Sequence, residues 1–381
     1  MPVILDHAAP DFEARFADLV SAERAGSADV TGAVDAILAD VRARGVEAVV
    51  ELTRRFDRWE ATAQTLALSE TEIDAAVDRV PPAQREALEL AAGRIRAYHA
   101  RQIPEDAEWT DDAGATLGWR WSSVDAAGLY VPGGLASYPS SVLMNAIPAR
   151  VAGVERLIVC APTPEGAVNP LVLLACRLAG VDAIYRVGGA QAVAAMAHGA
   201  GPIRPVDKIT GPGNAYVAEA KRRVFGTVGI DMIAGPSEVL VIADADNDPD
   251  WIALDLMAQA EHDESAQSIL ITDDAAFGAE VARAVERRLQ TLARAEIAGA
   301  SWRDHGAVIT VPDLAVAADL ANRIAPEHLE LCVAEPEALA AGIRHAGAMF
   351  LGRLTPEAIG DYVGGPNHVL PTARSARFSS G

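Results

Sequence analysis

Side chains able to bind a metal or transfer a proton occur together at three places in the second half of the chain. Gln259 and His262 stand three residues apart in a segment of helical composition, so an amide oxygen and an imidazole can converge on one cation. Glu327 is followed directly by His328, and these are the two side-chain types best suited to proton transfer near neutral pH. Asp361 lies in a glycine-rich segment that ends at His368 and offers a hard ligand and a substrate contact.

Two other glycine-rich segments can bring backbone close to a ligand. Gly211-Pro212-Gly213-Asn214 follows Asp207 to Thr210 and precedes a helical run, and a glycine-rich turn between a strand and a helix presents N–H groups to a polar or anionic ligand. Tyr216 occupies the place of the third small residue in a dinucleotide fingerprint. The segment from Leu129 through Pro132-Gly133-Gly134 to Ser141 allows the same close approach.

Each of these motifs also has a purely structural interpretation. The candidates are a plain strand-to-helix turn, a connection between domains, a solvated helix face, a charged turn and a surface loop. Adjacent residues of an extended segment point in opposite directions, so a site shared by Glu327 and His328 requires a bent backbone. Spacing alone does not decide between the interpretations. The remaining histidines have no partner pattern and are interpreted as structural: His7, His99, His198, His305 and His345.

The elements that must position these residues follow from the hydrophobic pattern. About the first 105 residues are predicted to be helical, with a capping box at Ser69 and Glu72. Short apolar runs then alternate with helical windows, which is typical of parallel sheets covered on both faces. The sequence therefore predicts an α/β protein with two sheets and domain breaks near Tyr130 and Gly235. The predicted strands are Leu157–Cys160, Ala183–Val187, Val239–Ile242, Ile269–Thr272 and Val308–Val311.

Composition excludes several classes of protein. The 381 residues carry a formal charge of −21, which disfavours a nucleic-acid partner. The uncharged stretch from Ala126 to Ala149 contains Pro132, Pro139 and Pro148 and is predicted to be a loop system, with no membrane segment. No signal peptide begins the sequence, and the three cysteines fit no paired pattern, so we expect reduced core thiols and a cytoplasmic location.

The order and combination of the motifs resemble the histidinol dehydrogenase family. The matching strings span most of the chain: Tyr130-Val131-Pro132-Gly133-Gly134, Tyr138-Pro139-Ser140-Ser141-Val142-Leu143-Met144-Asn145, Gly211-Pro212-Gly213-Asn214, Ala234-Gly235-Pro236-Ser237-Glu238, Gln259-Ala260-Glu261-His262-Asp263, Ala325-Pro326-Glu327-His328-Leu329 and Asn367-His368-Val369-Leu370-Pro371-Thr372. The resemblance implies a zinc- and NAD-dependent oxidation of L-histidinol, through L-histidinal, to L-histidine, the last steps of histidine biosynthesis.

The resemblance also implies roles for individual residues. Three side chains match zinc ligands that also contact the substrate: Gln259, His262 and Asp361. His328 matches the acceptor of the hydroxyl proton and a substrate contact, and Glu327 matches the residue that activates water. Ser237 and His368 match substrate contacts. The residues that match NAD contacts are Tyr130, Gln191 and Asn214.

The fold implied is a pair of incomplete Rossmann-like domains in a homodimer. Residues 1–128 and 237–381 are expected to form the domain of the metal and catalytic residues, including N-terminal helices, and residues 129–236 the NAD-binding domain. Family members continue into a C-terminal tail domain that gives the partner subunit a histidine ligand for zinc and a carboxylate for the substrate. The chain ends before that tail, so we expect three zinc ligands of its own. The alternatives are a paralogue that oxidises another small alcohol such as a sulfonated diol, a zinc hydrolase, and an inactive binding protein.

Overall fold

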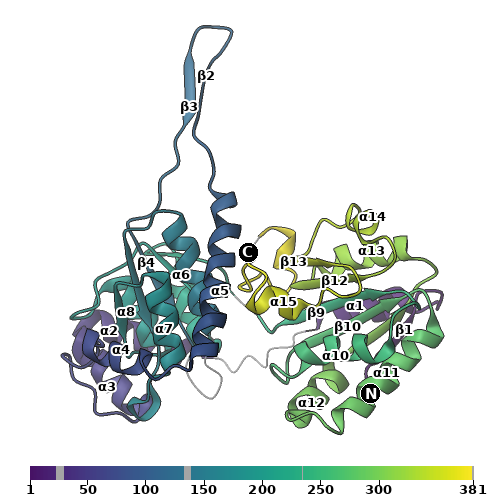
Figure 1. Ribbon diagram of the computed structural model, residues 1–381, viewed down its shortest axis with the longest axis horizontal. Helices are drawn as coiled ribbons and strands as arrows, with labels where there is room; N and C mark the ends of the chain where they lie inside the picture. The colour runs from purple at the N-terminus through teal and green to yellow at the C-terminus, as the bar shows by residue number, and fades with distance from the viewer. Residues whose placement is uncertain (23–29, 133–138, 234, 380–381) are drawn as a thin grey trace. The chain divides into compact units, whose positions relative to one another are not determined.

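The computed structural model describes residues 1–22, 30–132, 139–233 and 235–379. These residues form two compact units, each built on a parallel sheet with helices on both faces (Figure 1). The expected α/β class is therefore confirmed. Unit 1 comprises Met1–Gly26, Ala234–Gly360 and Leu370–Gly381, and unit 2 comprises Ser27–Ile233 and Asp361–Val369.

The sheet of unit 1 has six strands in the order β1-β11-β10-β9-β12-β13, and every neighbouring pair is parallel. The central strands β9, β10 and β12 are buried along their whole length, because both faces of the sheet are covered. The strands are β1 (Val3–Asp6), β9 (Glu238–Ala243), β10 (Gln267–Thr272), β11 (Ala307–Thr310), β12 (His328–Cys332) and β13 (Ala348–Leu351).

Alternate residues of these strands feed two separate cores. Leu240, Ile242 and Leu329 pack on one face with α1 and α13, whereas Val241 and Cys332 pack on the other face with α10, α11 and Trp302 of α12. The helices of this unit are α1 (Phe12–Ser21), α10 (Pro249–Ala260), α11 (Ala275–Leu289), α12 (Ala295–His305), α13 (Leu314–Ile324) and α14 (Pro336–Ala340), with a 3-10 turn at Ser375–Arg377. Helix α15 (Glu357–Tyr362) begins in unit 1.

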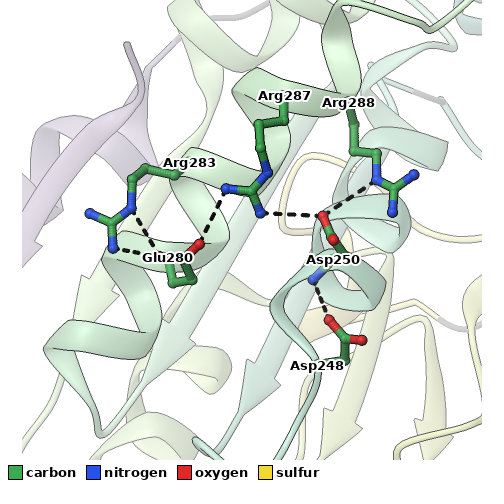
Figure 2. Close-up of polar contacts among 6 residues, drawn as sticks. All are labelled: Asp248, Asp250, Glu280, Arg283, Arg287 and Arg288. Atoms are coloured by element: carbon green, nitrogen blue, oxygen red, sulfur yellow. Dashed lines mark hydrogen bonds and ion pairs between the residues drawn. The ribbon is translucent and has the colours of Figure 1, made fainter.

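Polar contacts tie α11 to the first turn of α10 (Figure 2). Arg287 and Arg288 both reach Asp250 at 3.4 Å, and Glu280 accepts hydrogen bonds from Arg287 and from Arg283. Asp248 caps α10 by accepting the N–H of Asp250 at 2.9 Å. Exposed ion pairs contribute up to about 1 kcal/mol each, so the apolar face of α10 remains its main attachment to the sheet.

The sheet of unit 2 has five parallel strands in the order β6-β5-β4-β7-β8. Its strands are β4 (Ala126–Tyr130), β5 (Arg156–Cys160), β6 (Ala183–Tyr185), β7 (Lys208–Thr210) and β8 (Gly229–Ile230). One face packs on α2, α3, α8 and α9, and the other on α4 to α7. The helices are α2 (Thr31–Arg44), α3 (Val46–Asp57), α4 (Glu70–Val77), α5 (Pro82–His99), α6 (Pro139–Val151), α7 (Pro170–Ala179), α8 (Gly189–His198) and α9 (Ala215–Val224), with 3-10 turns at Ala100–Gln102 and Pro164–Gly166.

An antiparallel hairpin of β2 (Ala107–Thr110) and β3 (Thr116–Trp119) stands clear of the rest of unit 2 (Figure 1). Trp109 is 45% exposed and Trp119 is 54% exposed, and the two rings meet edge to face at 5.2 Å. Among the described residues, no helix combines the length and the apolar character that crossing a bilayer requires.

Several local predictions are confirmed and several are wrong. The five predicted strands are present, and Ser69 and Glu72 form the capping box at the start of α4. The N-terminal segment is not purely helical, because Val3–Asp6 adds a strand beside β11. The stretch predicted as loops contains β4 and α6, while Gly133, Gly134 and Tyr138 lie outside the described residues.

The division into units differs from the expected one in the placement of residues 27–128. These residues belong to unit 2, because α2 and α3 pack on one face of its sheet and α4 and α5 on the other. The expected break near Tyr130 therefore falls inside this unit, whereas the break near Gly235 coincides with the start of the second segment of unit 1 at Ala234.

Candidate active site

Glu327 and His328 lie at the start of β12, where the chain leaves helix α13. Ala325 ends α13 with a left-handed conformation (φ 50°), which turns the chain sharply into the strand. Both side chains are buried. A buried carboxylate requires hydrogen-bond donors, and Glu327 finds one in the backbone N–H of Glu238, which donates to its Oε2 at 3.0 Å.

The two candidate proton acceptors lie close together despite being adjacent in sequence. Nδ1 of His328 is 3.8 Å from Oε2 of Glu327, so the turn out of α13 supplies the bend that a shared site requires. Nδ1 also donates to the carbonyl oxygen of Glu238 at 3.0 Å. Because a carbonyl only accepts, Nδ1 carries the proton, and Nε2 is the basic nitrogen of the neutral ring.

Ser237 joins Glu327 and His328 at the same edge of the sheet. It directly precedes β9, and its carbonyl oxygen accepts the N–H of Gln267 at 3.0 Å. His328 is opposite Val239 in the register of β12 and β9, so these residues meet at the amino ends of the strands. Ligands of open α/β sheets usually bind at the carboxyl ends, so the placement in unit 1 is uncommon.

Gln259 and His262 also approach each other, but only Gln259 is helical. Helix α10 ends at Ala260, and His262 follows in a turn. The N–H of His262 donates to the carbonyl of Gln259 at 3.1 Å. The Gln259 side chain is fully buried, and its Nε2 is 3.4 Å from Nδ1 of His262. Within the described part of the chain, Oε1 of Gln259 has no hydrogen-bond partner. A buried amide oxygen beside an imidazole fits a cation ligand, because a bound cation would remove the cost of leaving that oxygen unpaired.

Asp361 and His368 belong to the second segment of unit 2, Asp361–Val369, which begins within α15. Asp361 lies in the last turn of α15, whereas the structural interpretation of its sequence segment was a surface loop. Nδ1 of His368 donates to the carbonyl oxygen of Asp361 at 3.1 Å, and Nε2 of His368 accepts the hydroxyl of Ser141 at 3.1 Å. Gln259 and His262 belong to unit 1, so the three predicted metal ligands are divided between the two units.

Asn214 caps α9 in unit 2, at the end of the glycine-rich turn. Its Oδ1 accepts the N–H of Tyr216 at 3.1 Å and that of Val217 at 3.2 Å. Two charged side chains, the buried Lys221 and the partly buried Asp231, fix the start of the turn. Gly211 donates its N–H to Asp231 at 2.8 Å, and its carbonyl accepts from Nζ of Lys221 at 2.9 Å. The predicted strand, turn and helix are therefore confirmed, and the turn lies at the carboxyl end of β7.

Tyr130 lies at the carboxyl end of β4, and Gln191 lies at the start of α8, the helix that follows β6 in unit 2. Tyr130 ends β4, and its hydroxyl accepts the N–H of Gly189 at 3.2 Å. Burial raises the pKa of Tyr130 to about 12, so the phenol is neutral at physiological pH. Gln191 lies in the first turn of α8, and its buried Oε1 is without a hydrogen-bond partner among the described residues. In parallel sheets this edge is where nucleotides usually bind.

Sequence reasoning missed four residues that the structure places at these sites. The turn Gly188-Gly189 opens α8 beside Tyr130, and its paired glycines were a visible signal. Glu238 contacts both Glu327 and His328, and Glu357 lies with Oε2 at 3.5 Å from Nδ1 of His328. Sequence spacing gave no signal for these two glutamates, because the contacts join distant segments.

The chain has the architecture of a two-domain α/β enzyme. One unit contains a buried Glu–His pair, and the other contains a glycine-rich turn before a helix. The family model for histidinol dehydrogenase matches residues 20–381. The chain belongs to the histidinol dehydrogenase family, which is a family of oxidoreductases. The resemblance seen in the sequence motifs is therefore confirmed.

Similar proteins cover the whole chain. Histidinol dehydrogenase of Ruegeria pomeroyi is 73% identical over 381 residues, which are 100% of this chain and 88% of that protein. The enzyme of that name from Rhodospirillum rubrum is 65% identical over 382 aligned residues, with the same coverage of 100% and 88%. A crystal structure of histidinol dehydrogenase from Elizabethkingia anophelis has a TM-score of 0.95 at 34% identity and covers 100% of this chain and 87% of that one.

The turn at Gly211 leaves no room for a side chain. Its φ is +114°, and a Cβ there would lie 2.1 Å from the carbonyl oxygen of Tyr130. Gly226 has a similar φ of +98° but nothing within 4 Å of a Cβ, so Gly226→Ala is a matched control that carries the backbone strain alone. We expect Gly211→Ala to lower the free energy of unfolding by at least about 2 kcal/mol more than Gly226→Ala. Urea denaturation measures the free energy of unfolding of both variants. Equal losses of stability would show that the close approach between Gly211 and the carbonyl oxygen of Tyr130 is unimportant.

Proposed function

We propose that this chain oxidises L-histidinol through L-histidinal to L-histidine, with NAD as electron acceptor and zinc in the site. The observation that carries the proposal is the 73% identity, over the full chain, to a protein named histidinol dehydrogenase. The buried Glu327–His328 pair supports it, because two sequential oxidations of an alcohol require a proton acceptor and then an activated water. The identity favours histidinol over another small alcohol as substrate.

In this proposal His328 accepts the hydroxyl proton of the alcohol at Nε2. Nδ1 keeps its own proton because it donates to the carbonyl of Glu238, which fixes the ring orientation. NAD would supply the hydride acceptor for each of the two oxidations, and Tyr130, Gln191 and Asn214 would hold it at the carboxyl edge of the unit 2 sheet.

Glu327 then removes a proton from the water that adds to the aldehyde. Its Oε2 is held by the N–H of Glu238 at 3.0 Å, so the carboxylate is oriented before the water arrives. Ser237 and His368 would contact the substrate. Gln259, His262 and Asp361 would bind the zinc, which when bound supplies an electrophilic centre that orients the substrate nitrogens. The buried Oε1 of Gln259 supports this ligand set.

An absorbance assay for reduced nicotinamide tests the proposed function directly. With L-histidinol and NAD, the purified zinc-loaded protein should form NADH and L-histidine. A hydrolase acting on a related substrate would give product without an NADH signal. A stronger signal with another small alcohol than with histidinol would contradict the substrate assignment.

The roles of Glu327 and His328 are separable. Glu327→Gln should slow the oxidation of histidinal more than that of histidinol, because only the second step needs an activated water. We expect a loss of about 10²–10⁴-fold in the second step, the usual size of a general-base contribution. Single-turnover assays with each substrate measure both steps, and equal losses in the two would refute the division of labour.

Zinc content tests the ligand assignment without reference to activity. His262→Ala should abolish stoichiometric zinc, because two protein ligands are left for a metal that prefers four-coordination. His345→Ala is the matched control, since His345 is a half-buried histidine in a different loop, the one that precedes β13. Elemental analysis of both folded variants gives the result, and undiminished zinc in His262→Ala would remove His262 from the ligand set.

The proposal includes a homodimer in the cytoplasm. The β2–β3 hairpin supports self-association, because a two-stranded hairpin is only marginally stable alone and this one exposes large apolar side chains. Leu117 is 46% exposed and Trp121 is 60% exposed, in addition to the two tryptophans of the strands. The free cysteines Cys160, Cys176 and Cys332 are all buried, which is consistent with a reducing compartment.

Oligomeric state tests the role of the hairpin. The double variant Trp109→Ser with Trp119→Ser should weaken the dimer by at least about 2 kcal/mol, roughly 30-fold in Kd, if the pair is an interface hot spot. Trp251→Ser removes a tryptophan that is also exposed, at 54%, but lies on α10. Light scattering across a concentration series compares the dimerisation of the wild type, the double variant and Trp251→Ser. A double variant that remains as dimeric as the Trp251→Ser control would exclude the hairpin.

A further inference from the structure

A cluster of three acidic side chains, Asp255, Glu330 and Glu357, lies near His328 in unit 1. His328, Glu330 and Cys332 alternate along β12, so all three project from the same face of the sheet. Glu330 is 0% exposed because it stands in the middle of a buried strand, an unusual place for an acidic residue. An acidic residue at such a position has to be paired or neutral, because an isolated buried carboxylate is very costly.

Two neighbours flank the Glu330 carboxyl group. Oε1 accepts the backbone N–H of Glu357 at 2.6 Å, and Glu357 is the first residue of α15. On the other side lies Asp255 of α10, whose carboxyl oxygen is within 4.8 Å of the Glu330 oxygen and of the Cys332 sulfur. Oε2 of Glu330 is buried and has no donor partner among the described residues. A proton on this oxygen would satisfy it by donating to Asp255.

Glu357 connects this carboxyl pair to the candidate active site. Its side chain is 2% exposed, and Oε2 lies 3.5 Å from Nδ1 of His328. The hydrogen bond from its own N–H to Glu330 fixes the start of α15 and thereby the place of this carboxylate. His328 is thus flanked by the carboxylates of Glu327 and Glu357, at 3.8 Å and 3.5 Å.

The charges in this cluster cannot all be present at once. Burial, then repulsion from Asp255 and Glu357, raises the pKa of Glu330 well above its ordinary value. Burial likewise raises the pKa of Asp255 to about 6, although the hydrogen bond with Glu330 lowers it. The groups that face Glu330 are Asp255 from α10, Glu357 from α15, and His328 and Cys332 from its own strand. Arg353, the nearby cation, is paired with Asp244 at 2.9 Å.

We propose that Glu357 is a positioning residue for His328, and that Glu330 holds it there as a neutral carboxylic acid. The acid donates to Asp255 on one side and accepts from the first turn of α15 on the other. With Glu330 neutral, the negative charge resides on Glu357, where it orients the imidazole and stabilises the imidazolium that forms when His328 accepts a proton. The kinetic part of this inference rests on the proposed function, whereas the protonation of His328 does not.

A metal ion held by Asp255, Glu330 and Cys332 is the competing explanation of the cluster. Burial and the neighbouring carboxyl groups raise the pKa of the Cys332 thiol, so a metal ion bound here would have to displace a proton from a buried sulfur. The metal content of the variants below distinguishes the two explanations.

Three variants and one control test the inference in the zinc-loaded enzyme. Glu357→Gln removes the charge beside His328. Glu330→Gln keeps an acceptor for the Glu357 N–H and a donor for Asp255, so it reproduces the neutral acid. Glu330→Leu removes both hydrogen bonds. Glu337→Gln neutralises an exposed carboxylate on α14 and is the matched control. Thermal unfolding establishes that each variant is folded.

NMR titration of 13C-labelled histidine measures the protonation of His328 without reference to turnover. The His328 signal is assigned by its loss in His328→Asn. In Glu357→Gln the midpoint of the His328 titration should move to lower pH by about one unit, because an opposite charge within 6 Å favours the charged form. The acid limb of the pH profile of kcat should move the same way, since His328 must be neutral to accept a proton. The plateau of kcat should fall about 10–100-fold with KM nearly unchanged.

The two Glu330 variants decide whether that residue is neutral. Glu330→Gln should match the wild type in midpoint and kcat, and Glu330→Leu should resemble Glu357→Gln. Three results would each overturn the inference. The first is a His328 titration midpoint that does not move in Glu357→Gln, and the second is a loss of activity in Glu330→Gln equal to that in Glu330→Leu. The third is the loss of a second metal equivalent in Glu330→Gln. If histidinol is not oxidised but the midpoints move as expected, the proposed function fails while the positioning role is supported.

Discussion

Two glutamates exchange hydrogen bonds across the start of strands β9 and β12, and the candidate active site depends on this exchange. The N–H of Glu238 donates to Glu327 at 3.0 Å, and the N–H of Glu327 donates to Glu238 at 3.2 Å. The other carboxylate oxygen of Glu238 accepts the N–H of Ala373 at 3.0 Å, and its carbonyl accepts from His328. Loss of one partner would leave a buried donor or charge unsatisfied, which costs more than a hydrogen bond contributes.

Unit 2 holds its glycine-rich turn by the same physical means. The buried Lys221 and the partly buried Asp231 form an ion pair, and each also forms a hydrogen bond with the backbone of Gly211. In both units, therefore, buried charged groups satisfy the backbone at the point where a strand and a turn meet. Such positions are expensive to build and are specified by several interactions at once, which is what a preorganised binding site requires.

The sequence predicted most of the local structure and the chemistry of the motifs, but little of what joins them. Continuous apolar runs identified strands such as Ile269–Thr272, because both faces of the sheet are covered, and Ser69 with Glu72 identified a helix start. The four-residue strand β1 escaped notice because it is held by β11, some three hundred residues away in sequence. Glu330 and Glu357 escaped notice for the same reason, since only tertiary contacts bring a strand residue and a helix start to His328.

Amide hydrogen exchange at Glu238 and Glu327 tests the central claim most directly, because these are the two N–H groups that the glutamate pair uses. If the exchange of hydrogen bonds anchors the site, both amides should be protected as strongly as those of the buried strand residues Leu240 and Leu331, and should open only with global unfolding. Rapid exchange at either amide, while Leu240 and Leu331 stay protected, would show that the pair opens locally and would contradict the account.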